Sequence, residues 1–208
     1  RREIMNAADV AATIVDMRNE TISEIVARAI PDNALSEQWD IDGLHAECLR
    51  LLALDVPLAD WAKEEGVDRR TVEERLVEAA EGHMAGKEAN FGVELMRMAE
   101  KSLLLQFLDH IWKDHLLQLD HLRQGINLRA YAQRDPLNEY KREAFELFSA
   151  MLATLREQVT GALTHLEMRM DAPPEPEPLP FGELSYSDEF PLEPEAVMAE
   201  TGPLPRRS

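Results

Sequence analysis

The feature that most constrains the fold is a pair of long apolar patterns with helical spacing, which together fill residues 94–168. Within each pattern the side chains recur at steps of three and four residues, which places them on one face of a helix. A short loop at about Asn127 to Asn138 separates the patterns, and a short connection makes successive helices antiparallel neighbours. The sequence therefore predicts an antiparallel two-helix hairpin. The face of the first helix holds Leu104, Leu108, Ile111, His115, Leu119, Leu122 and Ile126, and that of the second Tyr140, Phe145, Phe148, Leu152, Leu155, Val159, Leu163 and Leu166.

A second apolar row widens the face of the first predicted helix. This row consists of Leu105, Trp112 and Leu116. An apolar face of that width is more than one neighbouring helix covers. We therefore expect the first helix to pack against another element besides its partner in the hairpin.

The predicted loop carries an aromatic side chain with basic neighbours. Tyr131 lies between Arg129 and Arg134, where a plain turn holds Gly, Asn or Ser. Around it, the basic residues are Arg123, Arg129, Arg134, Lys141 and Arg142, and the acidic ones are Asp135 and Glu139. A basic hairpin end on an acidic protein is a candidate contact surface. The residues alone leave open the alternative that Tyr131 folds back onto the hairpin.

The charge and cysteine content exclude several classes of protein. The chain has 22 Lys and Arg against 40 Asp and Glu, a formal net charge of −18, which argues against a protein that coats nucleic acid or anionic membrane. Cys48 is the only cysteine, so an internal disulfide and a thiolate metal cluster are excluded, as fits a reducing compartment. No apolar run approaches the roughly 18 residues of a membrane span. The chain begins with Arg1, and we expect an internal piece of a longer protein.

Upstream of the hairpin the pattern predicts shorter helices and almost no strand, so the ordered part is predicted to be all-α. The predicted helices are residues 7–30, residues 39–54 and two small helices within residues 58–81, and Gly82, Gly86 and Gly92 indicate a looser connection to the hairpin. Downstream, nine of the twelve prolines lie in residues 173–205, and acidic residues outnumber basic ones. Such a segment cannot bury enough apolar surface to offset its ordering entropy. Residues 171–208 are therefore predicted to be a disordered acidic linker.

Two short stretches resemble functional motifs in part. Residues 58–76 have the Ala, Gly and Val spacing of a helix-turn-helix unit, but the acidic residues of residues 58–81 outnumber the basic ones, which opposes DNA binding. Gly82 to Lys87 lacks the spacing, the following Ser or Thr and the preceding strand of a phosphate loop. His115 lies in the apolar row and is interpreted as a hydrogen-bonded core histidine rather than a metal ligand. We find no catalytic pattern in this chain.

The hairpin residues also carry a resemblance to a known family. Residues 119–136, LDHLRQGINLRAYAQRDP, and residues 139–143, EYKRE, resemble the two-helix finger of the SecA family, the bacterial preprotein translocase motors. Residues 112–116 (WKDHL) and 39–44 (WDIDGL) strengthen the match. The resemblance covers about residues 1–170. It implies that residues 1–33 end the long helix of the helical scaffold, residues 34–92 form the helical wing, residues 93–170 form the finger of the scaffold, and residues 171–208 form a C-terminal linker.

The resemblance implies a function in protein export, in which ATP hydrolysis moves unfolded proteins through the SecY channel. It implies that Leu128, Arg129, Tyr131 and Arg134 contact the preprotein or the channel, and that Arg123 and Arg129 lie in a region that restrains ATP turnover. The implied partners are the SecY channel complex, unfolded preprotein, anionic membrane lipids, the nucleotide-binding domains of the same motor and a second copy of it, with no nucleic acid. The implied location is the cytoplasm and the cytoplasmic face of the bacterial inner membrane. ATP and Mg²⁺ belong to the full-length family, and for this piece we expect no cofactor, metal or catalytic site. A helix-turn-helix DNA-binding regulator built on Leu58–Leu76 and a helical adaptor are the alternatives.

Overall fold

The computed structural model describes residues 1–7, 9–32, 34–129 and 135–167, and of these the side chains of residues 126–129 and 136 fall outside the description. The described residues form helices and turns without a strand, which confirms the predicted all-α class. The predicted linker at residues 171–208 lies outside the described residues, and the predicted domain boundaries stay predictions. The helices are α1 (Arg2–Asn6), α2 (Ala11–Ala29), α3 (Ile41–Glu47), α4 (Leu58–Trp61), α5 (Arg69–Phe91), α6 (Val93–Arg129) and α7 (Pro136–Thr164), with a 3-10 turn at Ser36–Gln38 and a π-helical turn at Cys48–Leu52.

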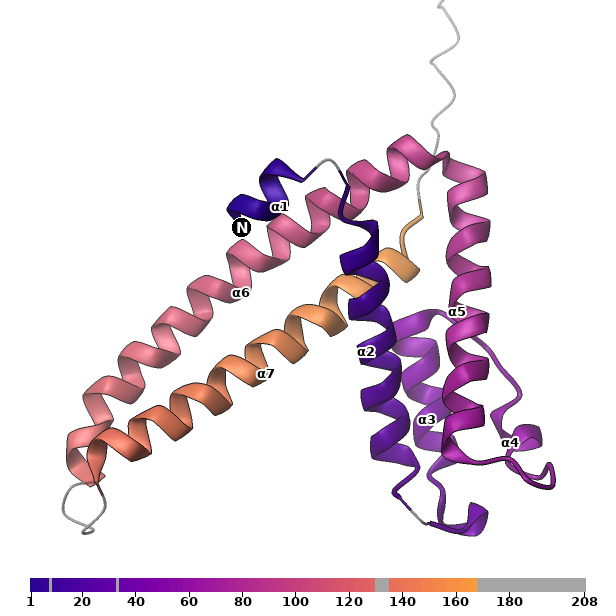
Figure 1. Cartoon of the computed structure of the whole chain (residues 1–208), viewed down its shortest axis with the longest axis horizontal. Coiled ribbons are helices and arrows are strands. Elements are labelled where there is room, and N and C mark those ends of the chain that lie inside the picture. Colours follow the sequence, from indigo (N-terminus) through magenta and orange to yellow (C-terminus); the bar gives the residue numbers. More distant parts are fainter. Residues whose placement is uncertain (8, 33, 130–134, 168–208) are drawn as a thin grey trace, which may run out of the picture. The chain divides into compact units, whose positions relative to one another are not determined.

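Helix α2 contributes to both hydrophobic clusters of the described residues, and it runs beside α5 (Figure 1). Its second half packs into the first cluster, together with α3, the π-helical turn, α4 and α5. We call residues 41–91, which hold these four elements, the α3–α5 unit. The first turns of α2 pack into the second cluster, with α6 and α7. The fully buried side chains of the first cluster include Ile22, Val26, Leu52 and Leu76, and those of the second include Met96, Leu104, Val159 and Leu163.

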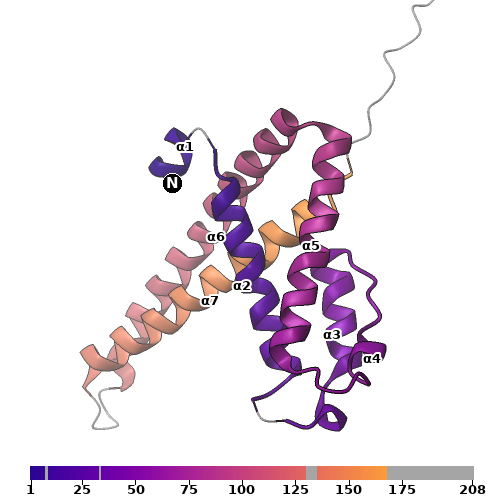
Figure 2. The same cartoon turned by 45° about the vertical axis from the view of Figure 1, so that its right-hand side comes forward.

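The predicted hairpin is formed by α6 and α7, which run antiparallel beside each other in both views (Figure 2). Pro136 is the first residue of α7, as predicted, because its fixed φ suits a first helical turn. Helix α6 also contacts α1, α2 and α5, so the expected additional partners are present. The contact with α1 includes Lys101, whose Nζ donates to the carbonyl oxygens of Met5 and Ala7 at 2.9 and 2.8 Å.

The helix predicted at residues 7–30 begins only at Ala11 as α2, and the short helix α1 (Arg2–Asn6) precedes it as a separate element. The backbone N–H of Ala11 donates to Oδ1 of Asp9 at 2.7 Å, so the side chain of Asp9 competes for a group that a continuous helix would use. The helix predicted at residues 39–54 begins at Ile41, where Asp40 caps it by accepting from Gly43 N at 2.9 Å. Its last turn widens into the π-helical turn, which ends at Ala53 with a left-handed φ of 53°.

The loose connection predicted at three glycines is wrong for two of them. Helix α5 runs without a break through Gly82 and Gly86, because a glycine in a helix interior costs only about 1 kcal/mol and the buried residues Leu76 and Ala80 hold the helix in place. Only Gly92 ends the helix, with a φ of 87° that residues with a side chain rarely adopt. The chain therefore bends at one residue between α5 and α6.

Candidate functional surface of the hairpin

The predicted contact residues lie at the end of the hairpin, and most of them are beyond what the structure describes. Tyr131 and Arg134 lie outside the described residues. The backbone of Leu128 and Arg129 forms the last turn of α6, and their side chains are outside the description. Arg123 is exposed on α6. The predicted roles of these residues therefore stay predictions.

The start of α7 shows how the sequence ends the loop. Oδ1 of Asp135 accepts from Leu137 N at 3.0 Å, and its Oδ2 accepts from the side-chain amide of Asn138 at 2.8 Å. Asp135 thus caps the positive end of the helix dipole. On the next turns Arg142 pairs with Glu139 at 2.7 Å and approaches Glu146 at 4.0 Å. Part of the basic charge predicted here is accordingly balanced by carboxylates on the same helix.

Farther along the hairpin, aromatic side chains are left partly exposed. The rings of Trp112 and Phe148 both contact the ring of His115 in tilted arrangements, with centroid distances of 5.5 and 5.9 Å. Phe145 is 70% exposed, although its spacing predicted a place on the packing face. The reason is that α7 packs through the row Met151, Leu155, Val159 and Leu163, and Phe145 falls off that i, i+4 row. We call Trp112, Leu116, Phe145 and Phe148, all at least 40% exposed, the apolar flank.

His115 is buried, as predicted, with 3% of its surface exposed. The predicted hydrogen bond is missing at Nδ1, which has no partner among the described residues. A cavity of about 190 Å³ adjoins the ring and is lined by polar groups from both helices. Its polar lining residues besides His115 are His110, Asp114, Gln118, Thr154 and Gln158. Such a lining suits water rather than an apolar ligand, and no described group of three or more His, Cys, Asp or Glu side chains could hold a metal ion.

The base of the hairpin is fixed by ion pairs to its neighbours. Arg156 on α7 pairs with Glu20 at 3.1 Å and with Glu24, both on α2. Arg97 at the start of α6 pairs with Glu88 of α5 and with Glu100, each at 2.6 Å. These contacts hold α6 and α7 against α2 and α5 at one end, whereas the other end projects away from them (Figure 1).

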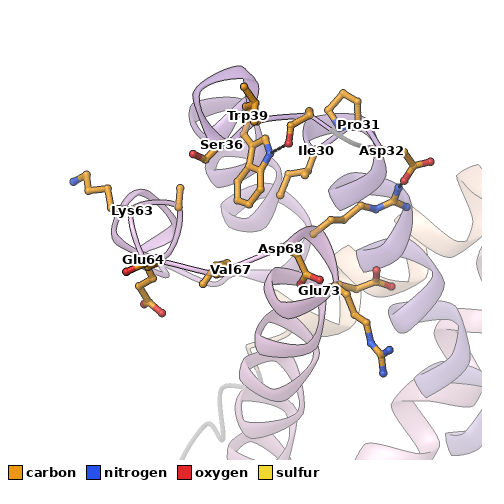
Figure 3. Close-up of a pocket in the computed structure, with 17 residues that line it drawn as sticks. Ile30, Pro31, Asp32, Ser36, Trp39, Lys63, Glu64, Val67, Asp68 and Glu73 are labelled. Carbon is orange, nitrogen blue, oxygen red and sulfur yellow. Dashed lines mark hydrogen bonds and ion pairs between the residues drawn. The ribbon is translucent and has the colours of Figure 1, made fainter.

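A separate open groove of about 1190 Å³ lies between the segment that follows α2 and the loop that precedes α5 (Figure 3). Trp39 lines it and donates from its indole N–H to the carbonyl of Ala34 at 3.2 Å. The arginines that DNA binding through residues 58–76 would need are engaged within the protein. Arg69 pairs with Asp32, Arg70 with Glu74 and Arg75 with Glu64, at distances of 2.6, 2.8 and 2.6 Å. This arrangement disfavours the helix-turn-helix alternative, because phosphate contacts supply most of the affinity for DNA.

Two further features bear on chemistry and location. Burial raises the pKa of the Cys48 thiol to about 12, with the charge of Glu47 as a smaller cause, so the thiol stays protonated and unreactive. Among the described helices, none has the length and apolar character needed to cross a bilayer.

Comparison with known proteins gives consistent matches. The SecA Wing and Scaffold domain family matches residues 1–167. The chain is 56% identical over 178 residues, 86% of its length, to the protein translocase subunit SecA of Acidiphilium cryptum, of which it covers 20%. It is 48% identical over 203 residues to the protein translocase subunit SecA of Granulibacter bethesdensis, and this match covers 98% of the chain and 22% of the relative. It is 45% identical over 205 residues to that of Afipia carboxidovorans, and this match covers 99% of the chain and 22% of the relative. The chain thus spans about a fifth of the length of these curated relatives.

Proposed function

The chain belongs to the SecA family, whose wing and scaffold domain it matches over residues 1–167, and from that premise we propose that its hairpin contacts preprotein and channel and couples ATP hydrolysis to protein export. The observation that carries this proposal is the geometry of α6 and α7. Helix α6 has 37 residues and is about 55 Å long at 1.5 Å per residue. Two long antiparallel helices fixed at one end by ion pairs and a packed core form a stiff lever, because bending them would disrupt the packing between them.

The end of this lever is the proposed contact surface. Tyr131 presents an aromatic ring, which makes sequence-tolerant contacts with unfolded polypeptide. Leu128, Arg129 and Arg134 would complete the contact with preprotein or channel, and Arg123 and Arg129 would restrain ATP turnover until the channel is engaged. The side chains of the apolar flank are exposed and therefore available for contact with another surface.

The proposal places this chain within a larger motor. ATP and Mg²⁺ would be bound by nucleotide-binding domains of the same motor, and the chain itself would supply the mechanical element. The SecY channel complex, unfolded preprotein and anionic lipids would be its partners at the cytoplasmic face of the inner membrane, and a second copy of the motor is a further partner.

Substitutions at Tyr131 in the intact motor test the proposal. We expect Tyr131→Ala to abolish most preprotein transport into membrane vesicles while changing the free energy of unfolding by less than about 0.5 kcal/mol, as for other surface changes. Tyr131→Phe retains the ring and should retain most transport, whereas Arg129→Glu inverts the charge of the tip and should weaken channel binding. If Tyr131→Ala leaves transport unchanged, the proposed contact is wrong. If it lowers the thermal midpoint by many degrees, the ring is a structural part of the hairpin instead.

A further inference from the structure

The C-terminal end of α7 is held to the α3–α5 unit by hydrogen bonds. The sequence pattern did not predict these hydrogen bonds. The hydroxyl of Thr164, which is 2% exposed, donates to the backbone carbonyl of Leu51 at 2.7 Å. A ring nitrogen of His165 lies 3.0 Å from the backbone carbonyl of Arg50. Leu51 and Arg50 both belong to the π-helical turn Cys48–Leu52. Two residues at the end of one helix therefore meet two carbonyls at the end of another.

These contacts satisfy groups that each helix end leaves unpaired. The last carbonyls of a helix have no donor within the helix, and the π-helical turn ends at Leu52, so the carbonyls of Arg50 and Leu51 need donors from elsewhere. On the other side, His83 and Lys87 of α5 contact the carbonyls of Thr164 and Leu166 at 3.2 and 2.8 Å. The end of α7 is thus seated between the π-helical turn and α5. We call this arrangement the α7 seat.

Thr164 has a property that suits a contact that opens and closes. Its hydroxyl carries one proton and has three acceptors within reach: Leu51 O at 2.7 Å, and Thr160 O and Gly161 O of its own helix at 3.0 and 3.1 Å. When α7 leaves the seat, the hydroxyl can turn to Thr160 O and stay hydrogen-bonded. Opening therefore does not strand a buried donor, which is the costly outcome for a buried polar group.

Besides the α7 seat, the hairpin is joined to the α3–α5 unit where α5 passes into α6 and by the ion pair between Arg97 of α6 and Glu88 of α5. Helix α5 passes into α6 at Gly92, whose positive φ and open surroundings place no side chain in the way of rotation. The ion pair of Arg97 lies close to Gly92, so it restrains the angle of the hairpin less than a contact farther from this point does. The α7 seat supplies such a contact, at the opposite helix of the hairpin.

We propose that Thr164 is a positioning residue, which fixes the angle of the α6–α7 hairpin against the α3–α5 unit by donating to Leu51 O at the π-helical turn. With the seat closed, the hairpin and the unit turn together, and with it open the hairpin pivots at Gly92. This inference rests on the proposed function, because it assigns to the seat the transmission of movement between the wing and the hairpin of that motor.

The angle can be measured by the distance between two spin labels. The labels are placed on Glu78→Cys in α5 and Leu117→Cys in α6, both exposed positions. The native Cys48 is fully buried, so it does not compete for label. Thr164→Val removes the hydroxyl and keeps the shape of the side chain. Thr164→Ser keeps the hydroxyl, and Thr154→Val is the matched control, because the hydroxyl of Thr154 donates to Ala150 O of its own helix.

We expect Thr164→Val to raise the population of displaced distances relative to the seated one by about fivefold, because the variant leaves the carbonyl of Leu51 without its donor in the seated state, at a cost comparable to one ordinary hydrogen bond. Thr164→Ser should restore the narrow distribution and Thr154→Val should leave it unchanged. An unchanged distribution in Thr164→Val overturns the proposal, and so does an equal change in Thr154→Val. If Thr164→Val does not fold, the double variant His165→Ala and Lys87→Met removes two other contacts of the seat, and an unchanged distribution in that variant overturns the proposal as well.

A second measurement separates this inference from the proposed function. In the intact motor, Thr164→Val should lower the amount of preprotein transported per ATP hydrolysed if the seat transmits the movement, and Thr164→Ser should restore it. A changed label distance with unchanged transport overturns the transmission role and leaves the export function untouched. Failure of the proposed contact between the hairpin and preprotein is recognised by unimpaired transport in Tyr131→Ala, whatever the label distances are.

Discussion

Glu47 shows how a single carboxylate links the elements around the π-helical turn. Its side chain accepts from Arg50 at 2.6 Å and lies 3.9 Å from Arg28 of α2, and both arginines reach Glu157 of α7 at 3.6 Å. The hydrogen bond from Arg50 lowers the pKa of Glu47, and burial opposes this shift. A lowered pKa in the folded state means that the carboxylate contributes stability above its unfolded pKa and loses it as pH falls through the folded pKa.

We therefore expect Glu47→Gln to lower the free energy of unfolding at pH 7 by up to about 1 kcal/mol, the range for partly exposed ion pairs. The difference from the unsubstituted chain should shrink as the pH falls below the ordinary carboxyl value and disappear below the lowered pKa of the folded state, because the native carboxylate is protonated only there. Urea unfolding at pH 7 and at a series of acidic pH values below the ordinary carboxyl value measures both differences. A difference that persists at the lower pH would mean that Glu47 acts through packing rather than through its charge.

Two leucines of α6 differ in burial and therefore allow the core of the hairpin to be compared with its surface. Leu104 is 1% exposed and Leu117 is 56% exposed. Leu104→Ala should cost about 2–5 kcal/mol, because it removes buried apolar area and leaves a cavity. Leu117→Ala should stay within about 0.5 kcal/mol. Chemical unfolding of both variants tests the pair, and similar costs would contradict the packing of the hairpin.

At the scale of the elements, a glycine in the interior of α5 and the glycine that ends this helix have opposite effects on stability. Gly92 has φ 87° and ψ 147°, a region that is nearly restricted to glycine, so Gly92→Ala should cost about 1–3 kcal/mol. Gly82 lies in the interior of α5, and an added Cβ there would meet no atom within 4 Å. Gly82→Ala should therefore stabilise the protein by about 0.5–1 kcal/mol. Thermal unfolding measures the change in stability of both variants, which should be negative for Gly92→Ala and positive for Gly82→Ala. A destabilised Gly82→Ala would show that α5 is strained.

The same contrast shows what the sequence could and could not predict. The long three-to-four spacing of α6 and α7 predicted the hairpin because many residues repeat the signal. Gly82 and Gly92 carry the same local signal, and only the tertiary packing of Leu76 and Ala80 decides that the helix continues past the first. The π-helical turn and the bond from Thr164 to Leu51 join residues far apart in the chain, for which periodicity gives no signal. Tyr131, by contrast, was singled out by its residue type, its basic neighbours and the family resemblance, and its role stays a prediction.

At the scale of the whole described unit, α2 joins both hydrophobic clusters. Ile14 belongs to the cluster with α6 and α7, and Ile22 to the cluster with the α3–α5 unit. Helix α7 adds a second link, because Arg156 binds α2 and Thr164 binds the π-helical turn. Neither cluster can lose its structure without exposing buried residues of the helix that the other needs.

We therefore expect the two clusters to unfold in one cooperative transition. Trp39 and Trp61 pack against the first cluster, whereas Trp112 lies on the hairpin. In a Trp112→Phe variant the tryptophan fluorescence then reports only the first cluster, and far-ultraviolet circular dichroism reports all helices. Coincident midpoints by the two probes are the expected result, since separate probes of a two-state transition agree. Leu104→Ala, made in the second cluster, should lower the fluorescence midpoint as much as the dichroism midpoint. If it lowers only the dichroism midpoint, the hairpin unfolds independently, and α2 does not couple the two clusters.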